Sequence, residues 1–404
     1  MALPRIITLS LILGFFGFAL YSVESFTSLF MHAEFKLDFT LIGVVFTLSN
    51  LSGAVLQIYT GRLGDRIGHK PVLVTMYSIG AASLIGLYYV AHSVHNVVIF
   101  SLLFLILAAS LWGSFPSFGA LVATSTRDRV VGFTITRVAL NVGTAIGPAV
   151  AGFLILGFGY PVIYLSAFLS ILAGLVLSLI FKPVGDHPTE TGEEEPQRKF
   201  RFRTVNRTII MLSFSSLLLT ILLAQDTVTL PNYASIVRNL TTAQIGLVFT
   251  SNGILVVLMQ YPVTKAIGRI GVARGYLLGL LFFSIGVFSF AFDSTVPQFI
   301  VSEAIITLGE DFLDPSGSAI VSGISAKKRI GANMGVYNSF NSVGYSIGPL
   351  IGGIVITATL NPFLIWTTVT APGFVSVILY LSTTIRKVGP AMKKGEVMPA
   401  GGKG

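Results

Sequence analysis

The chain has 404 residues, of which 53% are hydrophobic and only 11% are charged. An average soluble domain carries about 25% charged residues, so this composition excludes an ordinary water-soluble protein. The net charge of +9 would suggest nucleic-acid binding in a soluble protein, and the absence of cysteine excludes disulfides and thiolate metal sites. Residues 71–126 and 330–385 contain no Asp, Glu, Lys or Arg. One helical crossing of a bilayer needs about 20 apolar residues, so each of these runs holds two crossings.

In chain order, long apolar runs with internal glycines predict twelve membrane-spanning helices, at 6–31, 39–61, 71–91, 96–124, 131–157, 161–181, 208–235, 242–264, 275–292, 296–325, 330–358 and 362–385. Strands of a transmembrane barrel would instead be short segments of alternating polarity. The predicted fold class is therefore an all-α polytopic membrane protein. The first run is too long for the core of a signal peptide and is expected to remain as a helix.

The distribution of cations predicts the orientation of these helices. If the amino terminus is cytoplasmic, nearly all lysines and arginines fall on the cytoplasmic side. Lys36 and Arg238 then lie outside, and Arg137 lies within the fifth span. This asymmetry follows the positive-inside rule and predicts a multi-pass protein of the cell membrane with both termini in the cytoplasm. The positive charge is thus a topology signal, so the predicted partner is the lipid bilayer and not nucleic acid.

One polar, charged segment at 182–207 divides the spans into six and six. The predicted domains are a six-helix bundle at 1–181, this cytoplasmic linker, a second six-helix bundle at 208–385 and a cytoplasmic tail at 386–404. The halves repeat weakly, since Arg66-Ile67-Gly68 returns as Arg269-Ile270-Gly271. Six spans give both halves the same orientation, which predicts two pseudo-symmetric bundles related by an axis along the membrane normal, as in one class of secondary transporters.

The loop between the second and third spans reads Gly61-Arg62-Leu63-Gly64-Asp65-Arg66-Ile67-Gly68-His69-Lys70. It resembles the signature loop of the major facilitator superfamily, Gly-x-Leu-small-Asp-Arg-x-Gly-basic-basic. The resemblance implies a cytoplasmic latch in which Asp65 holds the two halves together, with Arg127 or Arg129 as partner and with Gly61, Gly64, Arg66, Gly68 and Lys70 completing the motif. The alternative is that the basic residues only fix topology. Gly268 stands where the second half would repeat Asp65, so the latch is asymmetric.

Span five contains Gly143, Gly147, Pro148 and Gly152, and span eleven repeats the pattern as Gly344, Gly348, Pro349, Gly352 and Gly353. The pattern resembles the Gly-x-x-x-Gly-Pro-x-x-Gly-Gly motif of drug:proton antiporters in that family, with Ala151 replacing one glycine. Small residues four apart allow close helix approach and proline permits a bend, so a hinge and ordinary packing both remain open. The Arg-containing fourth-span motif of the family is absent, because Phe104 holds its position. Arg137 either replaces it or extends to the membrane interface.

Ionisable residues inside the spans are the strongest chemical signal, because one charge at the bilayer centre costs about 2.5–3.5 kcal/mol. Span one carries Glu24, span seven carries Asp226, and span ten carries Glu303, Glu310, Asp311 and Asp314. On a helix, Glu310 and Asp314 fall about 20° to either side of Glu303. Glu310 lies near the middle of its span, where burial should be greatest. These acids are candidates for proton coupling, and hydrogen bonding between helices is the structural alternative.

Other polar or amphipathic residues within the spans are candidates for lining a substrate cavity: Tyr21, Gln57, Arg137, Asn141, Gln225, Asn252, Gln260, Tyr337, Asn338 and Asn341. The chain has no phosphate-binding Gly-x-x-x-x-Gly-Lys loop, which disfavours ATP-driven pumping. His92 and His95 have no acid nearby, so no metal site is predicted. No cofactor and no enzymatic activity are predicted either.

The predicted function is secondary active transport by a monomer that works by alternating access. The resemblance to drug:proton antiporters implies export of apolar or cationic organic compounds in exchange for protons. Three alternatives stay open from the sequence. These are a proton-coupled symporter for a small metabolite, a lipid flippase and a non-transporting membrane receptor.

Overall fold

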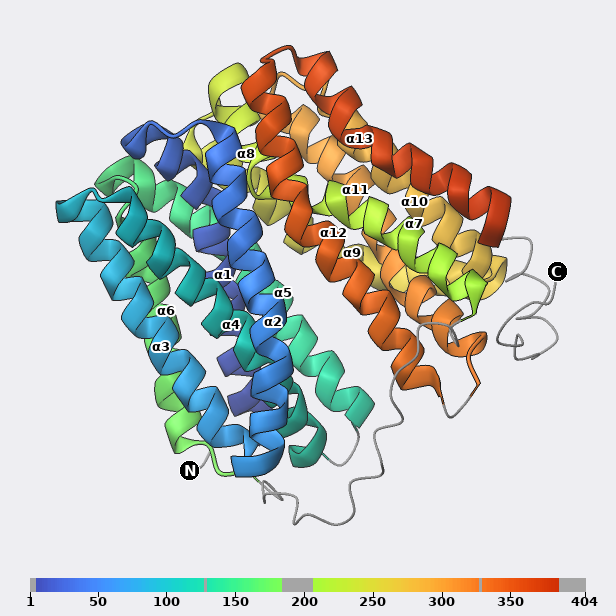
Figure 1. The fold of residues 1–404 in the computed structure, drawn as a ribbon, viewed down its shortest axis with the longest axis horizontal. Helices are drawn as coiled ribbons and strands as arrows, with labels where there is room; N and C mark the ends of the chain where they lie inside the picture. Colours follow the sequence, from blue (N-terminus) through green and yellow to red (C-terminus); the bar gives the residue numbers. More distant parts are fainter. Residues whose placement is uncertain (1–4, 127–128, 184–205, 327–328, 385–404) are drawn as a thin grey trace. The chain divides into compact units, whose positions relative to one another are not determined.

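The computed structural model describes residues 5–126, 129–183, 206–326 and 329–384. Within these residues the regular structure is helical and no strand occurs, which confirms the predicted fold class. The long and short α-helices (Figure 1) are α1 (Arg5–Phe35), α2 (Phe39–Ile67), α3 (His69–Tyr89), α4 (Val97–Ser125), α5 (Arg129–Phe158), α6 (Val162–Ile180), α7 (Arg207–Leu223), α8 (Thr229–Asn232), α9 (Thr242–Ile270), α10 (Val272–Ser289), α11 (Val296–Gly323), α12 (Ile330–Ala358) and α13 (Pro362–Leu379).

Most of the predicted linker and all of the predicted tail lie outside the described residues. Eleven helical segments of the described chain are long and apolar enough to cross a membrane. The helix α11 has a similar length but is not among them, because four carboxylates interrupt its apolar sequence. The twelve predicted spans therefore correspond to helices, and span ten is the span with the most acidic residues.

Helix ends follow local sequence signals. Four spans begin at an Asx residue whose side chain accepts hydrogen bonds from the first turn. Asp38 accepts from the N–H of Leu41 and Asn96 from that of Val98. Asn206 accepts from that of Thr208 and Asn361 from that of Leu364. These residues provide acceptors for backbone donors that lack a partner within the helix, so the short connections between spans also define where the spans start.

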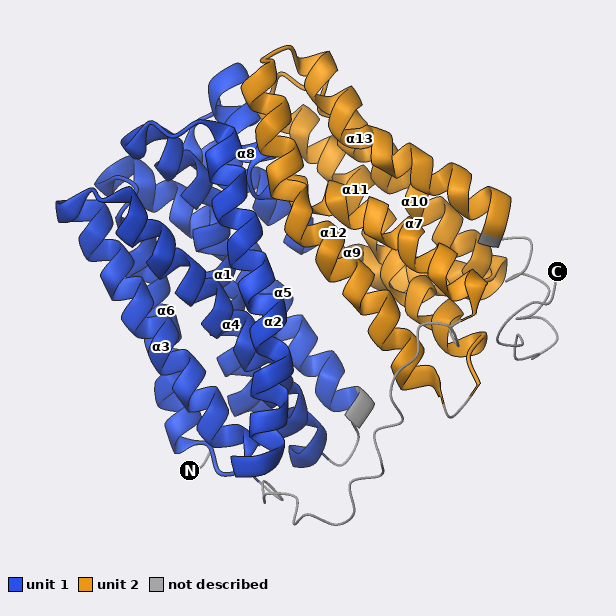
Figure 2. Ribbon diagram, viewed as in Figure 1, with its two compact units in different colours: residues 1–192, 226–254 blue, residues 193–225, 255–404 orange. Residues whose placement is uncertain are grey.

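The chain forms two compact units (Figure 2), of which unit 1 comprises residues 1–192 and 226–254. In unit 1, α1 packs against α5 and α6, and α3 packs against α4 and α6. Aromatic rings fill part of this core: the Phe30 and Phe100 centroids are 5.0 Å apart and those of Phe100 and Tyr164 are 5.6 Å apart. The predicted division of the chain at the linker itself stays a prediction.

Unit 2 comprises residues 193–225 and 255–404 and repeats the packing scheme of unit 1. Here α7 packs against α12 and α13, and α10 packs against α11 and α13. The helices that pair in unit 2 are thus the repeat counterparts of those that pair in unit 1. The weak sequence repeat therefore corresponds to a repeated helix arrangement.

The span predicted over 208–235 corresponds to the membrane-length segment Arg207–Val237, but its helix is interrupted. The helix α7 ends at Leu223 and is followed by a 3₁₀ turn at Ala224–Asp226, by the short α8 and by a π-helical turn. Pro231 lies in α8, and a proline has no N–H to donate to the carbonyl four residues earlier, against which its ring also clashes. A hydropathy profile is insensitive to this interruption because the segment stays apolar throughout.

Side-chain amides provide donors at this break. The Gln225 Nε2 atom donates to the Ile221 carbonyl at 2.6 Å and to the Gly348 carbonyl at 3.1 Å. The Asn232 Nδ2 atom donates to the Val228 carbonyl at 2.7 Å. Because buried backbone carbonyls need donors, these two amides make a broken helix possible inside an apolar segment.

Candidate functional site

The geometry of the α2–α3 turn depends on two glycines. Gly68 adopts a positive φ of 94° and its N–H donates to the Gly64 carbonyl at 2.9 Å. A Cβ atom at Gly64 would collide with the His69 ring. Gly64 therefore leaves the space into which His69 folds back.

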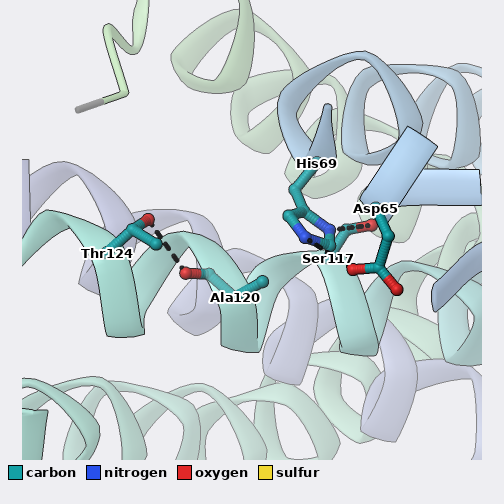
Figure 3. Close-up of polar contacts among 5 residues, drawn as sticks. All are labelled: Asp65, His69, Ser117, Ala120 and Thr124. Carbon is teal, nitrogen blue, oxygen red and sulfur yellow. Dashed lines mark hydrogen bonds and ion pairs between the residues drawn. The ribbon is translucent and has the colours of Figure 1, made fainter. Parts of the chain in front are cut away.

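His69 contacts both α2 and α4 (Figure 3). Its Nε2 atom lies 3.4 Å from Asp65 Oδ1, and its Nδ1 atom lies 3.5 Å from the Ser117 hydroxyl. The Asp65 side chain is 67% exposed, whereas that of His69 is 19% exposed. In the same figure the Thr124 hydroxyl donates to the Ala120 carbonyl at 3.0 Å, within α4.

The next residue of the motif, Lys70, contacts the end of α6. Its Nζ atom donates to the Leu179 carbonyl at 2.8 Å and to the Phe181 carbonyl at 2.6 Å. A cation at a helix carboxyl end compensates both the unpaired carbonyls and the helix dipole. Lys70 therefore connects the start of α3 to the end of α6. This contact is a structural role in addition to its contribution to the positive-inside asymmetry.

The predicted latch partners of Asp65 are not described, since Arg127 and the side chain of Arg129 fall outside the described residues. The structure instead places His69, four residues along the chain, next to Asp65. Sequence reasoning grouped His69 only as one of the basic residues of the motif. The spacing of four across a helix end was the available signal for this contact.

The second half repeats the turn without its polar cluster. Gly271 has a φ of 88° and its N–H donates to the Ile267 carbonyl at 2.8 Å. A Cβ atom at Gly268 would meet no described heavy atom within 4 Å. The backbone turn is thus duplicated, whereas the carboxylate and the imidazole occur in the first half alone among the described residues.

The glycine and proline motifs of spans five and eleven lie in continuous helices that pack closely on a neighbour. A Cβ atom at Gly147 would come within 2.7 Å of the Phe18 carbonyl oxygen of α1. At the repeat position, a Cβ atom at Gly348 would come within 2.8 Å of the Ile221 carbonyl oxygen of α7. Pro148 and Pro349 are interior residues of α5 and α12. The glycines therefore serve close packing, and the hinge role stays a prediction.

The same motifs contain further close contacts and buried positions. Gly143 faces the backbone of α1, Gly152 faces α9 and Gly344 faces α7. Gly352 and Gly353 are buried in α12.

Within unit 1, α5 also contacts the first half of α9. The Thr250 hydroxyl donates to the Ala145 carbonyl at 2.6 Å, and the Thr242 hydroxyl donates to the Gly152 carbonyl at 3.0 Å. A Cβ atom at Gly253 would lie 2.6 Å from the Ala145 Cβ atom. This contact combines small residues with hydroxyl groups, which is the composition that lets helices associate inside a bilayer.

The structure brings Glu24 and Asp226 together within unit 1. Glu24 is half-buried on α1, and Asp226 is half-buried at the break after α7. The two carboxyl groups are close enough to interact electrostatically. The Asp226 Oδ1 atom is buried and accepts no hydrogen bond from the described residues. Two carboxyl groups thus lie near each other beside an interrupted helix.

The four acids of α11 differ in burial. Glu303 and Asp311 are buried, with 5% and 7% of their surface exposed, whereas Glu310 is half-buried and Asp314 is exposed. Burial is therefore greatest at Glu303 and Asp311 and not at the centrally placed Glu310. Position along a helix indicates depth in the span, but the neighbouring helices decide which face is covered.

Sequence reasoning missed a further buried acid, Asp293, between α10 and α11. It is 6% exposed, and its Oδ2 atom accepts a hydrogen bond from the Ser302 hydroxyl at 2.6 Å. The Ser302 hydroxyl in turn accepts from that of Ser289 at 2.7 Å. Asp293 lies just beyond the predicted span 275–292, so it does not stand out as a charge within an apolar run.

The residues predicted to line a cavity fall into three groups by burial. Tyr21, Arg137 and Asn338 are exposed; Gln57, Asn141, Asn252, Gln260 and Asn341 are half-buried; Gln225 and Tyr337 are buried. The buried pair takes part in helix packing, since Gln225 donates to two carbonyls and the Tyr337 hydroxyl accepts from that of Ser216 at 3.1 Å. The cavity role of the whole group stays a prediction.

Comparisons with known proteins agree with this architecture. The profile of the Major Facilitator Superfamily matches residues 9–242 and 209–397. The uncharacterized MFS-type transporter YhjO of Bacillus subtilis (strain 168) is 22% identical over 358 residues, covering 86% of this chain and 86% of that protein. The multi-drug resistance efflux pump PmrA homolog of Lactococcus lactis subsp. lactis (strain IL1403) is 23% identical over 322 residues, covering 78% of each chain.

The fold has solved counterparts as well. The crystal structure of the nucleoside transporter NupG matches with a TM-score of 0.74 at 18% identity, covering 96% of this chain and 99% of that chain. At this identity the likeness concerns the fold and not the substrate. The signature turn, the repeated helix packing and the family profile agree over nearly the whole described chain, and the chain therefore belongs to the Major Facilitator Superfamily of membrane transporters.

Proposed function

We propose that this protein exports organic compounds, apolar or cationic, in exchange for protons, by alternating access. The observation that carries the proposal is the pair of carboxyl groups of Glu24 and Asp226, which lie close together within apolar spans. A charge at the bilayer centre costs about 2.5–3.5 kcal/mol, so such a pair needs a compensating positive charge. A proton and a cationic group of a substrate are alternative sources of that charge. When the carboxyl pair binds either a proton or a substrate cation but never both together, each transport cycle exchanges one for the other.

Similarity to the multi-drug resistance efflux pump PmrA homolog supports the export direction. In this proposal the protein lies in the cell membrane with both termini in the cytoplasm and acts as a monomer. Its partners are a small-molecule substrate, protons and the surrounding lipid. Asp65 and the α2–α3 turn bias the balance between the two access states without touching substrate.

The proposal is tested with purified protein in liposomes. Vesicles with an acid interior and the cytoplasmic face of the protein outward should accumulate a lipophilic cationic dye, and collapse of the pH gradient should release the dye. Accumulation only under the opposite gradient would identify a symporter and refute export. Absence of transport across a broad solute panel would refute transport and support a receptor.

Amide variants then test the carboxyl pair. Glu24→Gln and Asp226→Asn should abolish gradient-driven accumulation but retain downhill exchange of substrate, because the amide keeps the shape and removes the exchangeable proton. Glu34→Gln is the matched control, since Glu34 lies on the same helix but is exposed. Glu310→Gln, measured in the same assay, tests α11. Parental uphill transport by all three test variants would refute this assignment.

A further inference from the structure

A surface cavity of about 380 Å³ lies at one end of unit 1, where α1 begins, α4 ends and α5 begins. Its wall is formed by Arg5, Ile6, Ser125, Thr126, Val131, Gly132 and Ile135. A Cβ atom at Gly132 would lie 2.6 Å from the Thr126 hydroxyl oxygen. A glycine at this position therefore lets the Thr126 side chain pack directly against α5 at the wall of the cavity.

The polar part of the wall suits an anion. The Arg5 Nε atom donates to the Lys182 carbonyl at 3.2 Å, and a guanidinium carries four more N–H groups on its terminal nitrogens. The Ser125 hydroxyl oxygen is buried and has no hydrogen-bond partner among the described residues. A guanidinium and a hydroxyl on the wall of one cavity are a donor set that matches a phosphate group.

The remaining part of the wall is apolar and continues onto the surface of α5. Ile6 is half-buried, whereas Val131 and Ile135 are 51% and 42% exposed. Exposed apolar side chains of this kind offer a surface that a hydrocarbon chain can cover. The cavity therefore joins a cationic end to an apolar side, which is the pattern of a molecule with an anionic head and a hydrocarbon chain.

We propose that this cavity binds an anionic phospholipid, with the phosphate at Arg5 and Ser125 and an acyl chain along Val131 and Ile135. The cavity lies at the end of unit 1 that the positive-inside rule predicts to be cytoplasmic, and the cytoplasmic leaflet is the one that carries anionic lipids. Free phosphate shares the charge of the headgroup but lacks the chain that the apolar wall would contact. The proposal does not depend on the transported substrate or on proton coupling.

The test measures binding of phosphatidylglycerol and phosphatidylcholine to the purified full-length protein in nanodiscs or detergent, by native mass spectrometry. The parental protein should prefer phosphatidylglycerol. Arg5→Gln should weaken its binding roughly tenfold or more, the loss expected for a hydrogen bond to a charged group. Arg5→Lys, which keeps the charge, should bind more strongly than Arg5→Gln. Ile135→Trp keeps every charge but obstructs the cavity and should also weaken binding.

Arg62→Gln is the matched control, because Arg62 is an exposed arginine of the same unit that does not line the cavity. It should bind phosphatidylglycerol within about twofold of the parental protein, since one rim charge contributes little by itself. Unaltered binding by Arg5→Gln or by Ile135→Trp would overturn the proposal. Equal binding of phosphatidylcholine, or displacement of the lipid by an equal concentration of inorganic phosphate, would overturn it as well. Circular dichroism of each variant confirms that the fold is retained.

Discussion

The close packing of α5 on α1 predicts opposite effects for two glycine substitutions in the same helix. A Cβ atom at Gly143 would lie 2.8 Å from the Phe18 nitrogen and 3.0 Å from the Gly14 carbonyl carbon, both backbone atoms of α1. A Cβ atom at Gly157 would meet no described heavy atom within 4 Å. Gly143→Ala must therefore push two helices apart, whereas Gly157→Ala adds a methyl group in open space.

The magnitudes follow from two terms. Replacing glycine by alanine in a helix stabilises by about 0.4–1 kcal/mol through the unfolded chain, and this term is shared by both variants. Overpacking costs about 1–3 kcal/mol and applies to Gly143→Ala alone. The free energy of unfolding should therefore rise by about 0.4–1 kcal/mol for Gly157→Ala, and the two variants should differ by about 1–3 kcal/mol.

The assay is reversible unfolding of the purified protein in mixed micelles by increasing amounts of sodium dodecyl sulfate, followed by circular dichroism. Both variants are compared with the parental protein at the same lipid and detergent composition. Equal stability of Gly143→Ala and Gly157→Ala would show that α1 and α5 separate at no measurable cost. The reasoning that assigns the glycine motif to close packing would then be refuted.

Three further predictions concern residues that the structure places at helix ends. Asp65→Asn and His69→Asn should each slow transport turnover while substrate affinity stays within a few-fold. In a double-mutant cycle of turnover rates the two effects should be far from additive, because the side chains are in contact. Additive effects would show that the two residues act independently. Gln225→Met should lower the free energy of unfolding by about 1–3 kcal/mol, since two hydrogen bonds to buried carbonyls are lost. Unchanged unfolding in detergent would show that these two hydrogen bonds do not stabilise the break after α7. Lys70→Met should lower it by about 0.3–1 kcal/mol, whereas Lys70→Arg should keep most of the stability, and equal losses for both would argue against charge compensation at α6.

The contrast between α11 and the other spans shows which features of the fold a hydropathy profile predicts. Long apolar runs predicted helices near the observed bounds, because desolvation of the backbone in a bilayer leaves the helix as the stable conformation. Span ten was also recognised, although its acids keep α11 below the usual apolar threshold. Length, turn chemistry and the positive-inside rule are local or additive properties, and they can be evaluated without knowing which helices touch.

The sequence by itself thus determined the helices, the internal repeat and the resemblance of the α2–α3 turn to a family signature. Only the tertiary structure decided that Asp65 contacts His69, that α7 is interrupted next to Asp226, and that Glu303 and Asp311 are more buried than Glu310. The physical reason is that these outcomes depend on the neighbours of each side chain in space. An acid on a helix has a known depth along its axis, but its burial and its hydrogen-bond partners are set by the helices that pack against its face.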